Sequence, residues 1–436
     1  MGSSGSKPTQ GLVENKTNPF PAKVSKIFID GIERTKEDIL RDRVKHVFKS
    51  QSFDDVVNNA QDARIRLQTL GCFSDVVVQI DTSKEGGPQD YEITFKVKEL
   101  GRIKGIVNTL FGNQQGSLQC GLVFPNIWGR GERFSADYTR GFRECITFNG
   151  TLTKPLIHNS AIGASVFQQM ATYPNSGYKE TNRGMAVDLT FMTGPQMVHN
   201  LSYEGVWRDL RCAGKESAFA IREHSGHTLK SSIKHIFTVD KRDDHIFPNE
   251  GSYFRANQEF AGLGGNIGFF KSEVELQTNI PLIEELVLQV TLNGGNLRPY
   301  QDSEKNITVA DKFFIGGPLN VRGFEQRGLG HHIDGNAIGC SSFWASGLHL
   351  FHPIPLGRGG FGDFFRIHGF LNAGNALHEL SADALFRDTR MSYGCGLAFK
   401  LGGMARIELN YCIPVSTYKG DRLSPGFQFG VGVNFL

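Results

Sequence analysis

The side chains that could carry out chemistry are scattered through this sequence and form no recognised catalytic motif. Serine, histidine and aspartate are plentiful, but no GxSxG, HExxH, P-loop or GxGxxG turn lies at a strand–helix junction. His331 and His332 with Asp334 have the types of side chain that hold a metal, although such a group in a polar loop is more often solvated. We therefore expect no enzyme, no metal site and no cofactor.

The cysteines also argue against a metal or disulfide framework. There are seven of them, an odd number, and no two form a CxxC pair. The expected state is free thiols in a reducing compartment. They are Cys72, Cys120, Cys145, Cys212, Cys340, Cys395 and Cys412.

One arginine stands out because of its setting. Arg322 lies within a run that contains Gly316, Gly317 and Gly323, and clustered glycines allow a defined backbone path that other residues cannot follow. The run belongs to a long polar interval between two alternating segments, and long loops in compact domains are usually functional or disordered. From these residues alone, an ordinary turn-rich loop and a loop that presents an arginine are equally weighted.

Composition narrows the class of protein. The 436 residues carry a formal net charge of only +3, which gives no reason to expect nucleic-acid binding. High counts of glycine (52) and phenylalanine (34) are typical of β-rich architectures. No stretch reads as a transmembrane helix, but a strand of a transmembrane barrel needs only about 9–11 residues.

The N-terminal region differs from the rest of the chain. It lacks the basic and apolar segments of a secretory signal. Its first six residues fit the pattern for myristoylation of Gly2, and they fit a low-complexity start equally well. Residues 1–22 are polar and proline-containing, and we expect a disordered leader there.

Residues 23–100 predict a small α+β domain, because two helical patterns lie between strand patterns. The second helix begins at Ser52 or Asp54 and ends at Gly71. The other expected elements are strand Val24–Ile29, a helix from Lys36 to about Phe48 capped by Thr35, and strands Phe73–Ile80 and Tyr91–Val97.

After Leu100 the helical signal ends and the sequence alternates with a period of two. In the segment from Arg406 to Ile413, for example, Ile407 and Leu409 face one way while Glu408 faces the other. A soluble sandwich and a membrane barrel both give such a pattern. The length of the segments, the alternation of long and short connections, and an apolar last segment with nothing to cover it favour a closed barrel.

Sixteen strands are expected, since most such barrels have an even number. A seventeenth candidate, residues 216–224, is flanked by charge and is assigned to a loop. The strands lie near 104–112, 116–123, 132–141, 144–153, 160–170, 182–192, 197–209, 229–240, 252–262, 267–279, 285–296, 341–352, 366–374, 391–400, 404–414 and 426–436.

Three motifs carry a resemblance to a known family. The segment 27–32 with residues 70–73 looks like the signature of a polypeptide-transport-associated (POTRA) domain. Val321-Arg322-Gly323-Phe324, after Gly316 and Gly317, looks like a signature loop that folds into a barrel lumen, and residues 427–432 look like a closing strand. With this layout the chain resembles the superfamily of outer-membrane β-barrel insertases that carry POTRA domains. A single POTRA domain without a secretory signal favours its mitochondrial branch, the sorting and assembly machinery.

The resemblance implies a fold and a set of candidate residues. The fold is mainly β, a 16-stranded antiparallel transmembrane β-barrel in residues 101–436, with loop 297–340 inside its lumen and one POTRA domain before it. Bacterial relatives pair the loop arginine with carboxylates, whereas here His349 and Asn372 lie near the matching positions, so Glu408, Asp334 and main-chain carbonyls remain candidates. A lateral gate is expected between the first and last strands, with edges at Gly105, Gly112, Phe427, Gly430, Gly432 and Phe435.

The resemblance also implies a function. It is insertion of β-barrel precursors, of the general import pore and voltage-dependent anion channel type, into the mitochondrial outer membrane. The POTRA domain would face the intermembrane space. Implied partners are the lipid bilayer, metaxin-like accessory subunits and a cristae-organising complex of the inner membrane, with a contribution to cristae organisation. The alternative is a passive pore or a polypeptide-translocation channel.

Overall fold

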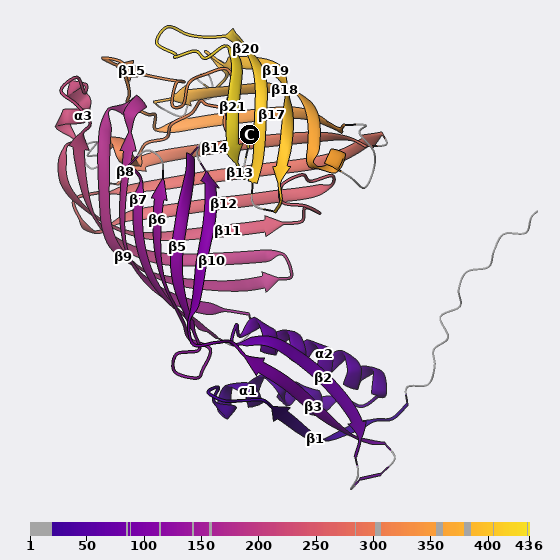
Figure 1. Ribbon diagram of the computed structural model, residues 1–436. Coiled ribbons are helices and arrows are strands. Elements are labelled where there is room, and N and C mark those ends of the chain that lie inside the picture. The colour runs from indigo at the N-terminus through magenta and orange to yellow at the C-terminus, as the bar shows by residue number, and fades with distance from the viewer. Residues whose placement is uncertain are drawn as a thin grey trace, which may run out of the picture. The chain divides into compact units, whose positions relative to one another are not determined.

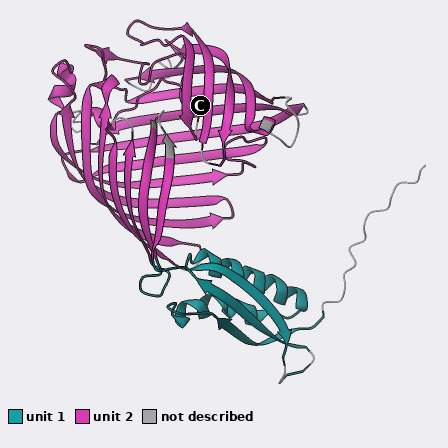
Figure 2. Ribbon diagram, viewed as in Figure 1, with its two compact units in different colours: residues 1–102, 125–132 teal, residues 103–124, 133–436 magenta. Residues whose placement is uncertain are grey.

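A computed structural model describes residues 20–436, except 84–85, 88, 113–114, 142–143, 157–158, 284, 301–306, 355–360, 379–384, 404 and 434. Gly2 and most of the expected leader lie outside the described residues. The chain forms two compact units, one of residues 1–102 and 125–132 and the other of residues 103–124 and 133–436 (Figure 2). In the described part of the chain, no helix is both long enough and apolar enough to cross a membrane.

The first unit is a three-stranded sheet with two helices. Its order is β1-β3-β2, with β1 and β3 parallel and β2 and β3 antiparallel. A capping box of Ser52 and Asp55 starts the long helix, and Gly71 at φ 68° follows its end. The elements are β1 Lys23–Asp30, α1 Glu37–Val44, the 3₁₀ helix η1 Lys45–Lys49, α2 Phe53–Thr69, β2 Phe73–Thr82 and β3 Asp90–Glu99.

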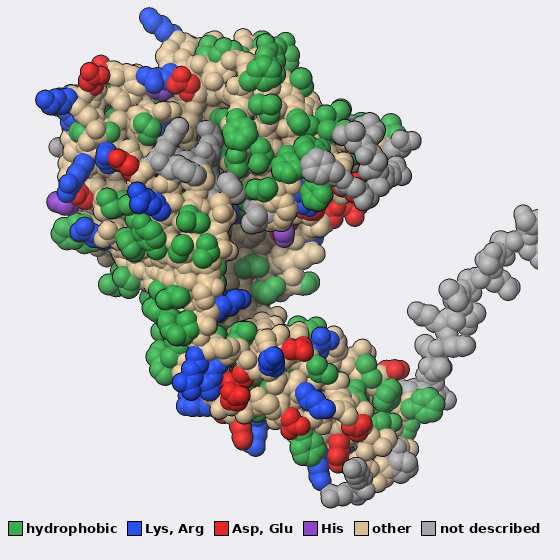
Figure 3. Space-filling view, in the orientation of Figure 1, with side chains coloured by type: hydrophobic (Ala, Val, Ile, Leu, Met, Phe, Trp, Pro, Cys, Tyr) green, Lys and Arg blue, Asp and Glu red, His purple; other side chains and the backbone are tan. Residues whose placement is uncertain are grey.

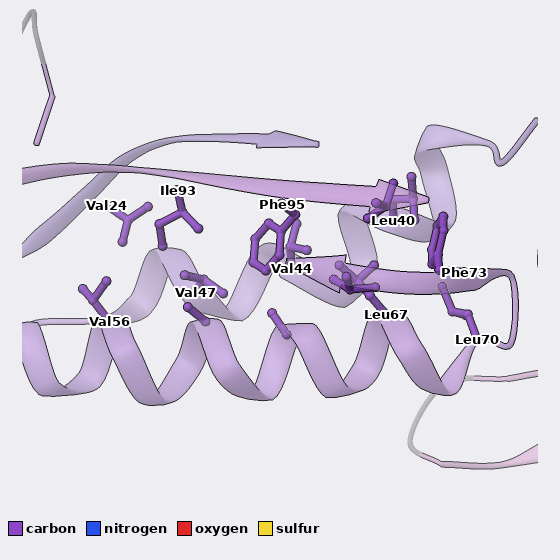
Figure 4. Close-up of a cluster of buried hydrophobic side chains, with 14 of the residues drawn as sticks. Val24, Leu40, Val44, Val47, Val56, Leu67, Leu70, Phe73, Ile93 and Phe95 are labelled. Atoms are coloured by element: carbon purple, nitrogen blue, oxygen red, sulfur yellow. The ribbon is translucent and has the colours of Figure 1, made fainter. Parts of the chain in front are cut away.

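One apolar face of α2 makes the core of this unit. Val56 and Leu67 lie on that face, toward Ile93 and Phe95 of β3 (Figure 4). All four side chains are almost completely excluded from solvent. Burying side chains of this size contributes about 1.5–3 kcal/mol each, which is what holds a helix to a sheet of only three strands.

Glu99, at the end of β3, binds the residues that precede α1. Its Oε1 accepts hydrogen bonds from the main-chain amides of Arg34 and Thr35 at 3.0 and 2.9 Å and from the Thr35 hydroxyl at 2.6 Å. The expectation that Thr35 caps the helix was therefore wrong, because its hydroxyl binds Glu99 and Lys36 occupies the cap position. Burial alone would raise the pKa of Glu99, but these hydrogen bonds lower it to about 2.

The turn Pro125–Glu132 belongs to this first unit, although it joins two strands of the second. Asn126 donates from Nδ2 to the Thr35 hydroxyl at 2.8 Å, and the Lys36 amide donates to the Gly129 carbonyl at 2.7 Å. Asn126 is buried and has a positive φ of 57°. Glu99, Thr35 and the turn therefore form one hydrogen-bonded cluster.

The second unit is one antiparallel sheet of sixteen strands, as the sequence predicted (Figure 1). It runs from β4 to β21 in chain order, apart from the two short strands β15 and β16, which pair only with each other. The sixteen are β4 Lys104–Gly112, β5 Gln115–Pro125, β6 Arg133–Gly141, β7 Ile146–Pro155, β8 Ala161–Tyr173, β9 Tyr178–Gly194, β10 Met197–Cys212, β11 Gly226–Asp240, β12 Gly251–Gly265, β13 Phe269–Ile283, β14 Leu286–Pro299, β17 Ser342–Pro353, β18 Phe365–Leu377, β19 Arg390–Leu401, β20 Ala405–Ser416 and β21 Gly426–Gly432.

The connections contain short helical segments. Within the range 216–224, which was assigned to a loop, α3 covers Phe219–Glu223 and buries Ile221 completely. The remaining segments are the 3₁₀ helices η2 Pro174–Ser176, η4 Val309–Asp311 and η5 Phe361–Phe364, and the paired strands β15 His332–Ile333 and β16 Asn336–Ala337.

The two faces of the large sheet have opposite character, and the apolar face is the exposed one, so many hydrophobic side chains lie on the surface of this unit (Figure 3). On β20, Leu409 and Tyr411 are 47% and 46% exposed, while Glu408 and Asn410, which alternate with them, are completely buried. A water-soluble sheet buries its apolar face instead. We call the face that carries Glu408 and Asn410 the inner face.

The last strand ends earlier than predicted. β21 stops at Gly432 rather than continuing to residue 436, and the Leu436 amide donates to the Leu319 carbonyl at 3.1 Å. Phe435 was expected to lie on the apolar face with Phe427, but it is buried on the inner side, 4.2 Å from the Arg406 guanidinium. The Phe435 ring packs on this guanidinium rather than on the outer face, so the alternation in the sequence did not mark the end of the strand.

Replacing Glu99 by Gln should destabilise the first unit by about 1–3 kcal/mol, since several donors lose a charged acceptor. Because folding lowers the pKa of Glu99 to about 2, its contribution is fully present above about pH 4.3, the ordinary value for Glu. It is lost as the pH falls toward 2. Hydrogen exchange of segments 31–36 and 126–131 in the full chain measures the effect. Asp81→Asn, at an exposed acceptor of Gln79, is the control, and equal protection in both variants would contradict the assignment.

Candidate functional site

The loop between β14 and β17 is a packed structural element. Its described part, residues 307–341, buries Phe313, Ile315, Val321 and Phe324 in one apolar cluster. Such burial supplies the packing that a long loop needs in order to hold one conformation. We call residues 307–341 the inner loop.

The glycines flanking Arg322 have a steric explanation. Gly316, Gly317 and Gly323 have φ values of 98°, 118° and 85°, a region that other residues rarely adopt. A Cβ atom added to Gly316 would lie 3.0 Å from the Glu325 carbonyl oxygen, and one added to Gly323 would lie 3.2 Å from Cβ of Ser392. The glycine spacing that the sequence singled out is therefore required by the path of the backbone.

Arg322 is completely buried, and its acceptors come from several strands. Its Nη2 donates to Oε2 of Glu408 on β20 at 2.8 Å, which makes an ion pair excluded from solvent. Its Nη1 lies 3.0 Å from the main-chain oxygen of Leu436 and 3.3 Å from Oδ1 of Asn372. The His349 ring nitrogen Nε2 is 3.4 Å from the same Nη1.

These contacts decide among the candidate partners of Arg322 that the sequence left open. Glu408, Asn372 and His349 all contact Arg322, together with a main-chain carbonyl. Asp334 does not: it is exposed in the turn between β15 and β16 at a φ of 46°. A carboxylate therefore pairs with the loop arginine, but from β20 rather than from the positions of His349 and Asn372.

Glu408 lies between two guanidinium groups. Its Oε1 is 2.9 Å from Nε of Arg406, which is also buried, although that N–H is not aligned for a hydrogen bond. Asn410 donates from Nδ2 to the other carboxylate oxygen at 2.8 Å. A buried carboxylate needs such compensation, because leaving water costs several kcal/mol.

Hydrogen bonds also hold the main chain of Arg322, Gly323 and Phe324. The Gly323 amide donates to Oε1 of Gln428 on β21 at 2.9 Å, and Gln428 donates from Nε2 to the Phe324 carbonyl at 3.0 Å. The Ser392 hydroxyl on β19 donates to the Arg322 carbonyl. Strands β19, β20 and β21 therefore all hold the same three residues of the inner loop.

The other end of the inner loop binds a different part of the sheet. Arg208 on β10 donates to Oδ1 of Asp311 at 3.0 Å and to the Thr308 hydroxyl at 2.9 Å, and its Nε lies 3.1 Å from Glu180 on β9. Burial alone would raise the pKa of Asp311, but Arg208 and the Thr308 hydroxyl keep it below its usual value. The guanidinium of Arg327 lies 4.1 Å from the Tyr173 ring centre on β8. The loop therefore joins β8–β10 to β17–β21.

The residues predicted for the gate edges behave differently from one another. Gly105 on β4 faces open space, whereas a Cβ on Gly430 would be 3.3 Å from Pro318 and one on Gly432 would be 3.2 Å from Leu319. The glycines of β21 thus allow the inner loop to approach. Phe427 is 75% exposed on the outer face. Gly112 closes β4 opposite Gln115.

Several residues of this site were not among the predicted candidates. They are Arg406, Asn410, His368, Ser392 and Gln428. Alternation did place Arg406, Glu408 and Asn410 on one face, so a polar inner face was visible in the sequence. What the sequence lacked was any signal for which of these side chains lies at the depth of Arg322.

Other candidate groups have local roles. The His332 ring nitrogens lie 3.0 and 3.1 Å from the carbonyl oxygens of Gly330 and Arg327. No group of three His, Cys, Asp or Glu side chains suited to a metal occurs among the residues that the structure describes. All seven cysteines are unpaired, and burial raises the pKa of Cys72 to about 12.

Sequence comparisons identify relatives of the whole chain. The family model of the Omp85 superfamily domain matches residues 126–435. Sorting and assembly machinery component 50 homolog B of Xenopus laevis is 40% identical, with 98% of this chain and 92% of the relative covered. The homolog of Homo sapiens is 38% identical over the same shares, and a SAM50-like protein of Drosophila melanogaster is 35% identical over 95% of each chain.

Solved structures share the fold. The crystal structure of BamA from Haemophilus ducreyi lacking POTRA domains 1–3 matches with a TM-score of 0.77 at 17% identity, covering 94% of this chain and 84% of that one. CdiB from Acinetobacter baumannii matches with a TM-score of 0.52 at 12% identity, covering 94% and 73%. At these identities the similarity concerns the fold alone.

Replacing Arg322 by Ala should lower the stability of the second unit by about 3–5 kcal/mol, because it leaves buried acceptors unpaired. The measurement is the thermal unfolding midpoint of the full chain in detergent micelles, followed by β-sheet circular dichroism. Arg422→Ala is the matched control, since its pair with Glu325 is 3.8 Å long and partly exposed and should contribute no more than about 1 kcal/mol. Equal midpoints for the two variants would show that Arg322 contributes no more to stability than an exposed arginine does.

Proposed function

Because the chain belongs to the Omp85 superfamily, among the homologues of sorting and assembly machinery component 50, we propose that it inserts β-barrel precursor proteins into the mitochondrial outer membrane. The observation that carries this proposal is the pair of unpaired sheet edges. β4 and β21 end the sixteen-stranded sheet, and no ladder joins them among the described residues. The sheet therefore offers two strand edges to an incoming strand.

The exposed apolar face supports a position within a membrane. Outward side chains such as Val166, Met185 and Leu409 are 67%, 63% and 47% exposed, which would be costly in water over so large a sheet. In lipid, the unpaired backbone groups of an open edge cost several kcal/mol each. Both points support our proposal that these strands form a transmembrane barrel with its seam between β4 and β21.

The seam provides a mechanism without covalent chemistry. A precursor strand that pairs with the edge of β4 or β21 satisfies its backbone groups before it reaches the hydrocarbon, as in β-augmentation. β21 has only seven residues, against twelve in β20. Because β21 is shorter than β4, part of the β4 edge lacks a partner even when the two strands pair, so opening a closed seam breaks few hydrogen bonds. We accordingly assign no catalytic residue.

The contacts of the inner loop also support an insertase that works through the seam. Ser392, Glu408 and Gln428 tie it to β19–β21, which stiffens the strands next to the seam. A cluster of buried apolar side chains from the loop occupies the inner side of the sheet. This packing argues against the alternative, a passive pore, because a wide water-filled channel would need a loop that is not packed there.

The remaining assignments rest on the family alone. With an even number of antiparallel strands, the start of β4 and the end of β21 lie on the same side of the membrane, which is the intermembrane space in our proposal. The first unit is then the POTRA domain. Metaxin-like accessory subunits and a cristae-organising complex of the inner membrane are its proposed partners, and the contribution to cristae organisation depends on that contact.

Disulfide cross-links across the seam test the gate. One cysteine replaces Val107 on β4 and the other is scanned along Phe427–Val431 of β21, with the exposed Cys120 and Cys395 changed to Ser. Cross-linked protein should lose insertion of a labelled β-barrel precursor into vesicles, and reduction should restore it. A cross-link between Leu409 and Phe429, which are paired neighbours on β20 and β21, is the control and should leave insertion intact.

Full insertion by protein that is completely cross-linked across the seam would refute the lateral gate. Ion conductance of the same samples separates the two functions. A passive pore would keep its conductance and show no precursor insertion in any state. An insertase loses insertion only when the seam is locked.

A further inference from the structure

Two buried imidazoles occupy the inner face beside Arg322. His349 on β17 has no exposed surface and His368 on β18 is 3% exposed. Their Nδ1 atoms are 3.3 Å apart. The Nε2 atom of His368 lies 2.8 Å from Oδ1 of Asn410. Together with the contacts of Arg322 and Glu408, these distances close a ring of five side chains.

The direction of every hydrogen bond in this ring follows from the guanidinium, which can only donate. Arg322 Nη1 donates to His349 Nε2, so the proton of His349 is on Nδ1 and points at His368 Nδ1. His368 therefore carries its proton on Nε2 and donates to Asn410. Asn410 donates to the Glu408 carboxylate, which also accepts from Arg322 Nη2.

Aromatic packing prevents the imidazoles from turning to other partners. The ring of Phe351 lies 4.8 Å from that of His368 with an angle of 4° between planes, and 5.6 Å from that of His349 with an angle of 8°. The Phe370 ring lies 5.8 Å from that of His349. Each ring is thus held in one plane, and only its proton content can change.

Charged groups from several elements surround the two rings. Arg322 of the inner loop and Arg406 of β20 are cationic, and Glu408 of β20 is the one carboxylate among the charged groups that act most strongly on the two imidazoles. Arg366 of β18 and Arg242 act in turn on Arg406. The neighbouring contacts from β19 and β21, Ser392 and Gln428, are uncharged. The main-chain oxygen of Leu436, the last residue, also lies 3.0 Å from Arg322 Nη1. A further proton is therefore opposed by the hydrogen bonds of the ring rather than by a lack of negative charge.

We propose that His349, His368 and Asn410 are positioning residues that hold the Arg322 loop only while both imidazoles are neutral. One added proton places two N–H groups face to face, either at His349 Nε2 against Arg322 or between the two Nδ1 atoms. The ring is complete above about pH 6.5, where an exposed imidazole loses its proton. Below that, its stability falls, by up to about tenfold per pH unit for each proton that opening takes up.

Hydrogen exchange of the inner loop in the full-length protein tests the proposal. Exchange of residues 314–330 is followed in detergent micelles at about pH 7.5 and about pH 5, on either side of the ordinary imidazole pKa, and corrected for the intrinsic effect of pH. The amide of Gly323, bonded to Gln428, is one of the reporters. Protection of this segment in the wild type should fall at the lower pH by about tenfold or more.

The double variant His349→Gln with His368→Gln tests whether the pH effect comes from protonation of these two imidazoles. Each glutamine can accept from one neighbour and donate to the next, but neither titrates. This variant should match the wild type at the higher pH and keep its protection at the lower pH. The single variant His349→Gln should lose less protection than the wild type, since one titrating ring remains.

The pair His199 and His235 provides the matched control. Their ring nitrogens are 3.1 Å apart and their rings stack, but they lie on β10 and β11, with no contact to the inner loop among the described residues. His199→Gln with His235→Gln should therefore retain the full pH effect. The proposal is overturned if protection in the wild type is the same at both pH values. It is also overturned if the His349→Gln, His368→Gln variant loses as much protection at the lower pH as the wild type does. Precursor insertion is not part of this measurement, so its outcome is independent of the insertase proposal.

Discussion

A guanidinium group keeps its charge at any pH in which a protein stays folded, so a fully buried arginine must be surrounded by acceptors. Arg322 imposes this requirement on the last five strands of the sheet. β17, β18 and β20 supply side-chain acceptors, and the segment after β21 supplies a main-chain oxygen. Glu408 pairs with both Arg322 and Arg406, so removing the charge of any one of these three residues leaves another buried charge without full compensation.

The polar inner face and the apolar outer face have one physical origin. Strands with a period of two present one set of side chains to each side, and the inner loop gives the polar set its partners. Without the loop, Arg208, Gln428 and Glu408 would face an empty interior. The loop therefore stabilises two distant parts of the sheet, β8–β10 through Arg208 and Arg327, and β17–β21 through Arg322 and Gln428. Of the two end strands, it holds β21 through Gln428.

Much of this architecture could be predicted from the sequence, because a period of two is visible without tertiary information. All sixteen strands were predicted near their observed ranges, and the glycines around Arg322 marked a real constraint on the backbone. The failures have a common cause. Thr35 binds Glu99 instead of capping a helix, and Phe435 leaves the strand to cover Arg406. In both cases a partner that is far away in sequence outweighs the local pattern.

The choice among acceptors for Arg322 was beyond sequence reasoning for a related reason. Alternation shows which face a residue occupies, but it does not give its depth along the strand. Register between strands brings His349, Asn372 and Glu408 to the level of Arg322, whereas Asp334 lies in the turn between β15 and β16, outside the large sheet. Register is set by the whole sheet, so His368 and Asn410 were equally hidden.

The contact between Arg322 and Leu436 spans 114 positions of the chain, and this separation fixes the order in which the protein can fold. Closing so long a segment is entropically expensive until the intervening strands are paired. The inner loop can therefore reach its final position only after β17–β21 have formed. A molecule whose last strands have not yet paired therefore leaves Arg322 without the acceptors that bury its charge.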